Sequence, residues 1–517
     1  MSDSVTTSKR LIHNTAFNML TLVVNAAVGF ALIRFFLGRL GEERYGIWVI
    51  IASIFNYRDM LSVGLNSSVN RYIPVYLAKN DSDGVQRVIN TSVFLLSFLA
   101  IILALCTLII YSNIGDWFAI SPNLVGPAQA LTLIVGFCFA IAMPLQLASA
   151  VLSGLQRYDI VSLTILVPLL LRTVLLVVLL TRGYGLLTMG FAFGLSEIII
   201  RVLQFAFGWK LLPRISPSLK SVDFKLLREM MAYGANTFLY SMGAVIISKA
   251  SDIVIGVFLG SAAVSQFYVA AASVLLLSQL LQAFTAAVKP AVSDLDTRNE
   301  HLYVREISFL SQKYSLLLLI PAGCFLVLMG GDLLRIWVGG KFEDPAVIQK
   351  LGLILAILTV GHCLRLAQHS NFIVLVGRGE HKIFGVLTAL TGLLCVFASV
   401  VSVKVFGKGL LGIAWSNALP MALVSGLVLP IYFNKKMNIS ITESIRRVWL
   451  PAFLGSLPCV VMIGLWKCLY PPAHWFDIIA VVLCAMLAAF LGSWLIAFSR
   501  QERRRFLRIA LPSMAGD

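Results

Sequence analysis

Charged side chains interrupt several long apolar stretches of this sequence and are the first candidates for chemistry. A charge in lipid costs about 2.5–3.5 kcal/mol on insertion scales, so each one needs a partner, a ligand or water. Because cations outnumber acids, the set could bind an anionic ligand in an aqueous cavity. The basic members are Arg34, Arg58, Arg172, Arg201, Lys249 and Arg365, and the acidic members are Asp59, Glu197 and Asp252.

Some of these charges can be neutralised within their own helices. Glu197 and Arg201 are four residues apart, so they can pair on one helical face. Lys249 and Asp252 are three residues apart and can pair in the same way. A purely structural role therefore stays open for both pairs.

The other cations are of two kinds. Arg34, and Arg58 beside Asp59, can extend toward a membrane interface, in which case they need no ligand. Arg172 and Arg365 have no acid within one helical turn. We therefore expect these two to meet either an acid from another helix or an anionic ligand in a cavity.

Amide side chains accompany the charges in the same stretches. An asparagine in a membrane helix often only bonds a neighbouring helix, with a contribution of about 0.6 kcal/mol. Alternatively, the first, second, seventh and eighth apolar stretches surround a central cavity. The residues expected to line that cavity are Asn25, Arg58, Asp59, Lys249 and Asp252, and Asn236 lies at the start of the seventh stretch.

The elements that must position these residues are membrane helices. The chain has 517 residues, a mean hydropathy of +0.90 and only 13% charged residues, against roughly 25% in soluble domains. Apolar runs of about 20 residues recur, each long enough to cross a ~30 Å hydrocarbon layer as a helix. The expected fold class is therefore all-α integral membrane, with about fourteen transmembrane helices.

The connections between these helices predict the orientation of the chain. Lysine and arginine are roughly three times as frequent on the side of the termini as on the opposite side, which places both termini in the cytoplasm. Anionic lipid headgroups then account for the net charge of +17, so no nucleic-acid partner is expected. The expected spans are 13–37, 46–65, 90–112, 124–151, 160–181, 186–211, 231–259, 264–288, 314–337, 350–376, 383–405, 410–433, 447–469 and 476–498.

An internal repeat predicts how the helices are grouped. Asn14-Thr15 and Phe36-Leu37-Gly38 recur at one constant offset as Asn236-Thr237 and Phe258-Leu259-Gly260, although short apolar matches also arise by chance. Six spans separate the copies, which favours a parallel repeat about an axis along the membrane normal. The expected organisation is an N-terminal six-helix lobe (1–212), a C-terminal six-helix lobe (213–433), and two additional helices with a basic cytoplasmic tail (434–517).

Signatures of cofactor and metal chemistry are missing from the sequence. There is no G-x-x-x-x-G-K-[ST] loop, no H-E-x-x-H or G-x-S-x-G motif, and the eight cysteines form no C-x-x-C pair. We therefore expect no cofactor, no metal and no catalytic residues. The absence of a large hydrophilic loop between the spans also argues against an enzyme.

One segment carries a recognisable pattern. Residues 40–48, Leu-Gly-Glu-Glu-Arg-Tyr-Gly-Ile-Trp, resemble the L-G-x-x-x-Y-G-x-W/Y motif between the first two spans of Wzx-type polysaccharide flippases. Segments 61–64 and 70–73 resemble the same family's entry to the first cytoplasmic loop, and segments 251–260 and 267–271 are similar to its seventh span and the exit from that span. These motifs indicate the wider multidrug/oligosaccharidyl-lipid/polysaccharide exporter superfamily and separate its branches poorly.

The resemblance implies a function and assigns roles to the charged residues. The family moves undecaprenyl-pyrophosphate-linked oligosaccharide repeat units across the bacterial inner membrane by alternating access, for surface polysaccharide assembly. The implied partners are this substrate, membrane lipids and the polysaccharide polymerase machinery. The implied substrate-binding residues are Arg34, Arg58, Arg172, Lys249, Arg365, Asn25 and Asn236, and Asp59, Asp252 and Glu197 are candidates for ion coupling.

Other functions stay open at this point. A peptidoglycan-precursor flippase or a multidrug exporter of the same superfamily would show the same topology, although an exporter of cationic drugs should have more acid in its cavity. A membrane-embedded polysaccharide polymerase or ligase is the alternative from a different class. It would be expected to have a long extracytoplasmic loop with clustered Arg and His, and no connection here fits that description.

Overall fold

The computed structural model describes residues 2–212, 218, 221–285, 288–342, 344, 346–380 and 382–504, with the side chains of all of these except 2–19, 61 and 236. Regular secondary structure in these ranges is entirely helical, which confirms the all-α class. The chain forms two compact units, one of residues 1–268 and 388–406 and the other of residues 269–387 and 407–517. The lobe boundaries expected from the sequence stay predictions.

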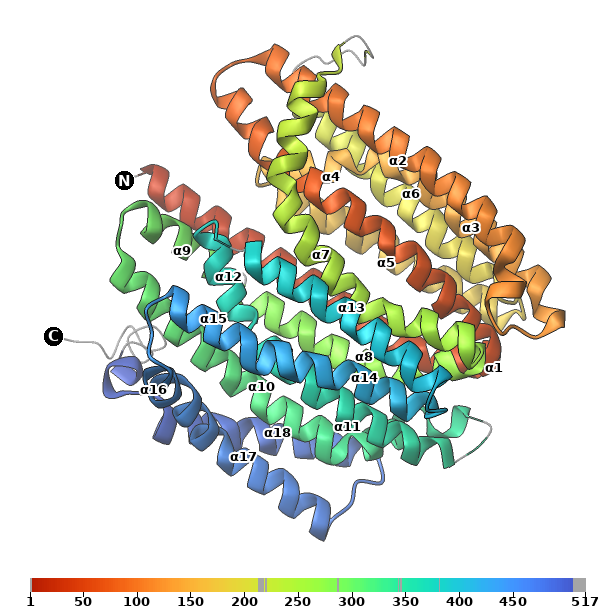
Figure 1. Cartoon of the computed structure of the whole chain (residues 1–517), viewed down its shortest axis with the longest axis vertical. Helices are drawn as coiled ribbons and strands as arrows, with labels where there is room; N and C mark the ends of the chain where they lie inside the picture. The colour runs from red at the N-terminus through yellow and green to blue at the C-terminus, as the bar shows by residue number, and fades with distance from the viewer. Residues whose placement is uncertain are drawn as a thin grey trace. The chain divides into compact units, whose positions relative to one another are not determined.

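The first unit is built from the N-terminal helices and part of α13. In Figure 1, α2, α3 and α6 run side by side within this unit. Its helices are α1 (Ser2–Ala78), α2 (Ser82–Trp117), α3 (Pro122–Leu145), α4 (Leu147–Gly154), α5 (Tyr158–Thr181), α6 (Leu187–Lys210), α7 (Phe224–Phe258), the start of α8 (Ser261–Thr285) and most of α13 (Lys382–Lys404).

The second unit contains the remaining helices, and three π-helical turns are continuous with them. Its α-helices are the rest of α8, α9 (Val288–Thr297), α10 (His301–Val338), α11 (Ala346–Ala367), α12 (His369–Gly377), α14 (Gly409–Leu423), α15 (Leu429–Lys436), α16 (Ile441–Ser444), α17 (Leu450–Leu469) and α18 (Trp475–Gly492). The π-helical turns are η3 (Val424–Val428), η4 (Ile445–Trp449) and η5 (Ser493–Ala497), and η2 (Gly339–Lys341) is a 3-10 turn.

Thirteen helical segments of the described chain are long and apolar enough to cross a membrane. The first, Leu20–Ala78, has 59 residues, or about 90 Å of helix against a ~30 Å hydrocarbon layer. It breaks at Gly41, whose φ of 78° and ψ of 172° suit glycine alone. The expected spans 13–37 and 46–65 lie on either side of this break, and the total of fourteen stays a prediction. The protein is a multi-pass membrane protein.

Small residues bring α1 and α7 together in the first unit. A Cβ added to Gly234 would lie 2.3 Å from the carbonyl oxygen of Gly64, so neither backbone leaves room for a side chain there. Nearby, the hydroxyl of Ser68 donates a 2.6 Å hydrogen bond to the Met230 carbonyl. Such contacts replace the hydrophobic effect as the source of cohesion between helices in lipid. They fix the face that α1 presents to the rest of the unit.

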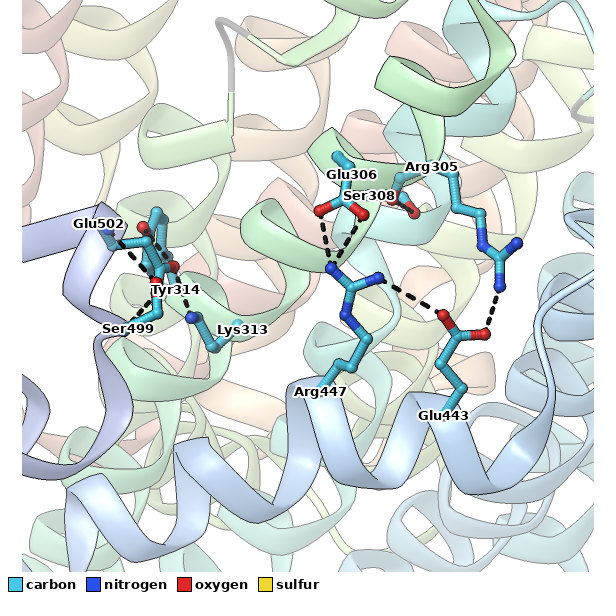
Figure 2. A network of polar contacts seen from close by, with 9 residues as sticks. All are labelled: Arg305, Glu306, Ser308, Lys313, Tyr314, Glu443, Arg447, Ser499 and Glu502. Atoms are coloured by element: carbon cyan, nitrogen blue, oxygen red, sulfur yellow. Dashed lines mark hydrogen bonds and ion pairs between the residues drawn. The ribbon is translucent and has the colours of Figure 1, made fainter. Parts of the chain in front are cut away.

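In the second unit, α17 and α18 pack on α10. Met329 of α10 is buried with Cys459 and Val481 of the two C-terminal helices. A Cβ on Gly492 would lie 2.2 Å from the Gly455 oxygen, so α17 and α18 also touch through backbone. Figure 2 shows the polar contacts that join α10 to the segments before α17 and after α18. The two C-terminal helices are therefore an integral part of this unit.

Candidate functional site

An arginine–glutamate–arginine cluster lies inside the first unit. Arg58 of α1 donates from Nη2 to Oε1 of Glu197 on α6 at 2.9 Å. Arg201, one turn further along α6, donates to the same oxygen from Nε at 2.9 Å and approaches it with Nη2 at 2.8 Å. The side chains of Arg58, Glu197 and Arg201 are only 9%, 16% and 15% exposed. Two cations from different helices therefore share one largely buried carboxylate oxygen.

Neighbouring polar groups extend this cluster at both ends. Arg58 also donates from Nε to Asp59 at 3.2 Å, and the Asp59 side chain is 47% exposed. Arg201 donates from Nη1 to the Gln204 amide oxygen at 3.0 Å, and Gln204 is fully buried. The expected pairing of Glu197 with Arg201 is confirmed. Arg58 is held by two carboxylates instead of extending freely to an interface.

Aromatic rings cover the flat faces of two arginines in this unit. The Arg58 guanidinium lies 3.6 Å from the centroid of the Phe139 ring on α3. The Arg172 guanidinium on α5 lies 4.0 Å from the Phe193 ring centroid, and Trp48 packs against the same ring at 4.5 Å. Rings in these positions stabilise a cation through their negative faces and fix its plane. The Nε atom of Arg172 is buried and has no hydrogen-bond partner among the described residues.

Lys249 and Asp252 of α7 do not form the ion pair that their spacing allows. Within the described residues, no contact of 4 Å or less joins their charged atoms. Asp252 is 3% exposed and accepts a 2.7 Å hydrogen bond from the hydroxyl of Ser53 on α1. Lys249 places its ammonium 5.4 Å from the centroid of the Tyr268 ring. The direct ion pair that the spacing allows is therefore absent from the described residues: the acid accepts its hydrogen bond from another helix, and the Lys249 charge acts on it from a greater distance.

Three further candidates for substrate binding belong to the first unit and are not part of this cluster. Arg34 is exposed on α1. Asn25 donates from Nδ2 to the Thr21 carbonyl of its own helix at 3.2 Å. The side chain of Asn236 lies outside the described residues. The substrate-binding roles of all three stay predictions.

Arg365 belongs to the second unit, in the last turn of α11. Buried polar side chains surround this end of the helix: His362 is 7% exposed, and Gln368 and Asn371 are 1% exposed each. Asn371 donates from Nδ2 to the Gln368 amide oxygen at 2.9 Å. Arg365 thus lies in a polar part of its unit, and its proposed contact with substrate stays a prediction.

Sequence reasoning missed several members of the first-unit cluster. Arg201 was explained by its local pair alone, and nothing in the sequence connects Phe139 or Phe193 with an arginine on another helix. The residues that the structure describes include no group of three His, Cys, Asp or Glu side chains able to hold a metal ion. Arginine, with its rigid fork of donors, is suited to binding oxyanions. The largely buried arginines of the first unit could therefore bind and release an anion.

The chain is similar to several known proteins. Residues 11–296 match the family described as "Polysaccharide biosynthesis protein". The chain is 22% identical over 458 residues to an uncharacterised membrane protein, EpsK, of Bacillus subtilis, covering 87% of each. It is 25% identical over 153 residues to a putative O-antigen transporter of Shigella flexneri, covering 30% of this chain and 36% of the relative.

Solved structures show the same fold at low sequence identity. The lipid II flippase MurJ in an inward closed conformation gives a TM-score of 0.70 at 14% identity, covering 96% of this chain and 99% of that one. An inward-facing multidrug resistance MATE transporter of the MOP superfamily gives 0.64 at 16% identity, covering 83% and 98%. Both are membrane transporters, and the likeness confirms the all-α membrane fold class, while the count of fourteen helices and the lobe layout stay predictions.

Proposed function

Since the chain belongs to the polysaccharide biosynthesis protein family, we propose that it is a flippase for undecaprenyl-pyrophosphate-linked oligosaccharide repeat units. It moves them across the bacterial cytoplasmic membrane for surface polysaccharide assembly, with both of its own termini in the cytoplasm. The fold of membrane transporters supports alternating access as the mechanism. The protein uses no cofactor and makes or breaks no covalent bond.

The observation that carries this proposal is the surplus of arginine inside the first unit. Around Glu197, the three cations Arg58, Arg172 and Arg201 meet two acids, Glu197 and the more exposed Asp59, while the buried Asp252 of the same unit is bonded to Ser53 instead. A surplus cation in a lobe surrounded by lipid is expensive unless an anion compensates for it. A pyrophosphate brings at least two negative charges and several acceptor oxygens, which arginine side chains bind well.

Each candidate residue has a separate role in the proposed cycle. The pyrophosphate loses its hydration and is bound instead by Arg58, Lys249 and Arg365, with further contacts from Arg34 and Arg172. Asn25 and Asn236 offer amides that can bond sugar hydroxyls. Asp59, Asp252 and Glu197 are the candidates for exchanging a coupling ion. The polysaccharide polymerase machinery would receive the product on the outer face.

The test is complementation of a strain that lacks this gene, with Arg58→Gln, Lys249→Gln and Arg365→Gln made singly. We expect each to reduce surface polysaccharide at least about tenfold, as the loss of one charge-assisted hydrogen bond would, while the level of inserted protein stays normal. Arg157→Gln is the matched control, because Arg157 pairs with Asp159 at the half-exposed start of α5. Wild-type polysaccharide from all three variants would contradict the proposed site.

A second assay tests the function itself. The purified protein in liposomes should move a fluorescent undecaprenyl-pyrophosphate-linked oligosaccharide between leaflets. A protein that leaves this lipid in place, but rescues cells depleted of their peptidoglycan-precursor flippase or exports cationic drugs, would replace the proposal with the corresponding alternative. Covalent lengthening of the oligosaccharide in the liposomes would indicate a polymerase instead.

A further inference from the structure

We propose that Glu197 is an internal anion that occupies a phosphate-binding site of the first unit, and that a substrate phosphate displaces its carboxylate toward Arg172. The inference rests on the proposed function, because a lipid-linked pyrophosphate is the displacing ligand. It makes Arg201 a further substrate-binding residue. It makes Glu197 a positioning residue, and it gives Arg172 a positioning role in place of direct support for the pyrophosphate; both then control how tightly the phosphate is held.

The site that Glu197 occupies is a clamp of two guanidinium groups. Nη2 of Arg58 and both Nε and Nη2 of Arg201 point at one carboxylate oxygen, at distances of 2.8–2.9 Å. Guanidinium groups arranged in this way also suit the oxygens of a phosphate, which carries more charge and more acceptors than a carboxylate. The carboxylate therefore holds the clamp in a geometry that a phosphate can use.

The clamp has supports that do not depend on Glu197. The Phe139 ring covers the Arg58 guanidinium at 3.6 Å, and Asp59 accepts from its Nε at 3.2 Å. The buried Gln204 accepts from Nη1 of Arg201 at 3.0 Å. Because each arginine has its own anchor, the two can stay in place when the carboxylate leaves. A preorganised site of this kind loses little entropy on binding.

Arg172 offers the displaced carboxylate a second position. Its Nε is buried without a hydrogen-bond partner among the described residues, while the Phe193 ring covers its face at 4.0 Å. Glu197 is the acid whose charge acts on it. A buried donor left unsatisfied is costly, so a carboxylate that turns toward Arg172 satisfies a group that otherwise has no acceptor.

The two positions of Glu197 give the site two states with similar numbers of charge pairs. Without substrate, the carboxylate neutralises Arg58 and Arg201. With substrate, the phosphate does so and the carboxylate neutralises Arg172. A ligand can shift such an equilibrium only by its difference in affinity for the two states. An internal competitor therefore weakens binding and speeds release, and a transporter must release what it binds.

The experiment measures binding of undecaprenyl pyrophosphate to the full-length protein in phosphatidylcholine nanodiscs. Glu197→Gln keeps the shape of the side chain and removes its charge, so we expect about tenfold tighter binding together with slower transport. Arg172→Gln should weaken binding about tenfold in the wild-type background and have no effect in the Glu197→Gln background. That dependence on background is the signature of the exchange. Arg157→Gln should bind as the wild type does.

The opposite results overturn the inference. If Glu197 only holds the arginines in position, Glu197→Gln will weaken binding in a protein whose unfolding temperature and dispersity are unchanged. Equal effects of Arg172→Gln in both backgrounds would likewise exclude the exchange. Phosphatidylglycerol is tested as a competitor, because an ordinary anionic lipid carries a phosphate too. If it competes as well as the pyrophosphate and depends on Glu197 in the same way, the site binds bulk lipid and the assignment to substrate is wrong.

Failure of this inference can be distinguished from failure of the proposed function. If Glu197 and Arg172 are coupled but the protein moves no lipid-linked oligosaccharide in liposomes, the exchange is supported and the proposed function is wrong. If the protein moves this lipid but Glu197→Gln and Arg172→Gln have additive effects on binding, the proposed function is supported and the exchange is wrong.

Discussion

Lys313 of α10 donates a hydrogen bond of 2.5 Å to Glu502, which lies 189 residues later, beyond α18. The same oxygen accepts from the Tyr314 hydroxyl at 2.9 Å, and the backbone N–H of Ser499 donates to the other at 2.6 Å (Figure 2). The side chains of Lys313 and Glu502 are 8% and 13% exposed. Burial opposes ionisation of this carboxyl, but the bonds from Lys313 and Ser499 prevail and lower the pKa of Glu502.

Glu502→Gln is predicted to destabilise the second unit. It leaves the buried Lys313 ammonium without its carboxylate, and removing one member of a buried pair costs about 3 kcal/mol. The measurement is thermal unfolding in detergent at neutral pH. Arg298→Gln is the control, since Arg298 and Asp294 form an ion pair that is mostly exposed and should contribute little. Equal unfolding temperatures for Glu502→Gln and the wild type would contradict a stabilising role.

The same pair predicts a pH dependence of stability. A carboxyl whose pKa is lower in the folded protein stabilises it above the unfolded-state pKa, and this contribution is lost as pH falls through the folded-state value. The pKa of Glu502 is lowered from 4.5, so the loss occurs below about pH 4.5. The difference in unfolding temperature between wild type and Glu502→Gln should shrink below that pH. A constant difference down to pH 3 would argue against this origin.

Gly234→Ala is predicted to disrupt the contact between α1 and α7. The new methyl group would lie 2.3 Å from the Gly64 oxygen, and backbone cannot yield as a flexible side chain does. Overpacking of this kind costs about 1–3 kcal/mol. Gly29→Ala is the control on α1, because a Cβ there meets no atom within 4 Å. The unfolding temperature should fall for the first variant and stay the same or rise slightly for the second.

Ser53→Ala is predicted to destabilise the protein through Asp252. The substitution removes the 2.7 Å hydrogen bond to a buried carboxyl group, which should cost about 1–3 kcal/mol. The double variant Ser53→Ala/Asp252→Asn should lose less unfolding free energy than the two single variants together, because it has no carboxylate that the loss of Ser53 could leave without a hydrogen bond. Additive losses in unfolding free energy would show that Ser53 does not act through Asp252.

The orientation of the chain can be tested with reporter fusions. A reporter joined after residue 120 should report the periplasm, and reporters joined after residues 80, 220 or 300 should report the cytoplasm, because the basic connections stay inside. A cytoplasmic signal from the fusion after residue 120 would contradict the predicted topology.

Hydropathy and local spacing predicted the membrane helices and the pairing of Glu197 with Arg201. Both depend on residues near each other in the sequence, where helical geometry alone fixes which side chains meet. The bond from Arg58 to Glu197 could not be predicted, because it joins residues 139 apart and depends on how α1 packs against α6. The same reason applies to Asp252, for which the spacing allowed a local partner and Ser53 of another helix is found.

The π-helical turn η4 (Ile445–Trp449) sets the rotational phase of α17. A π-turn holds one residue more than the α-helical hydrogen-bond pattern requires. Deleting a single residue there would restore the α pattern and leave the following residues nearly in their present phase, whereas deleting one from the regular helix between Leu450 and Ala452 would rotate everything that follows by about 100°. The anchor before this turn, where Glu443 contacts Arg305, would keep its place. Gly455 and Cys459, which face inward, would stay inward after the deletion in η4 and turn outward after the deletion in α17, so the π-turn is where this helix can change its length without changing its face.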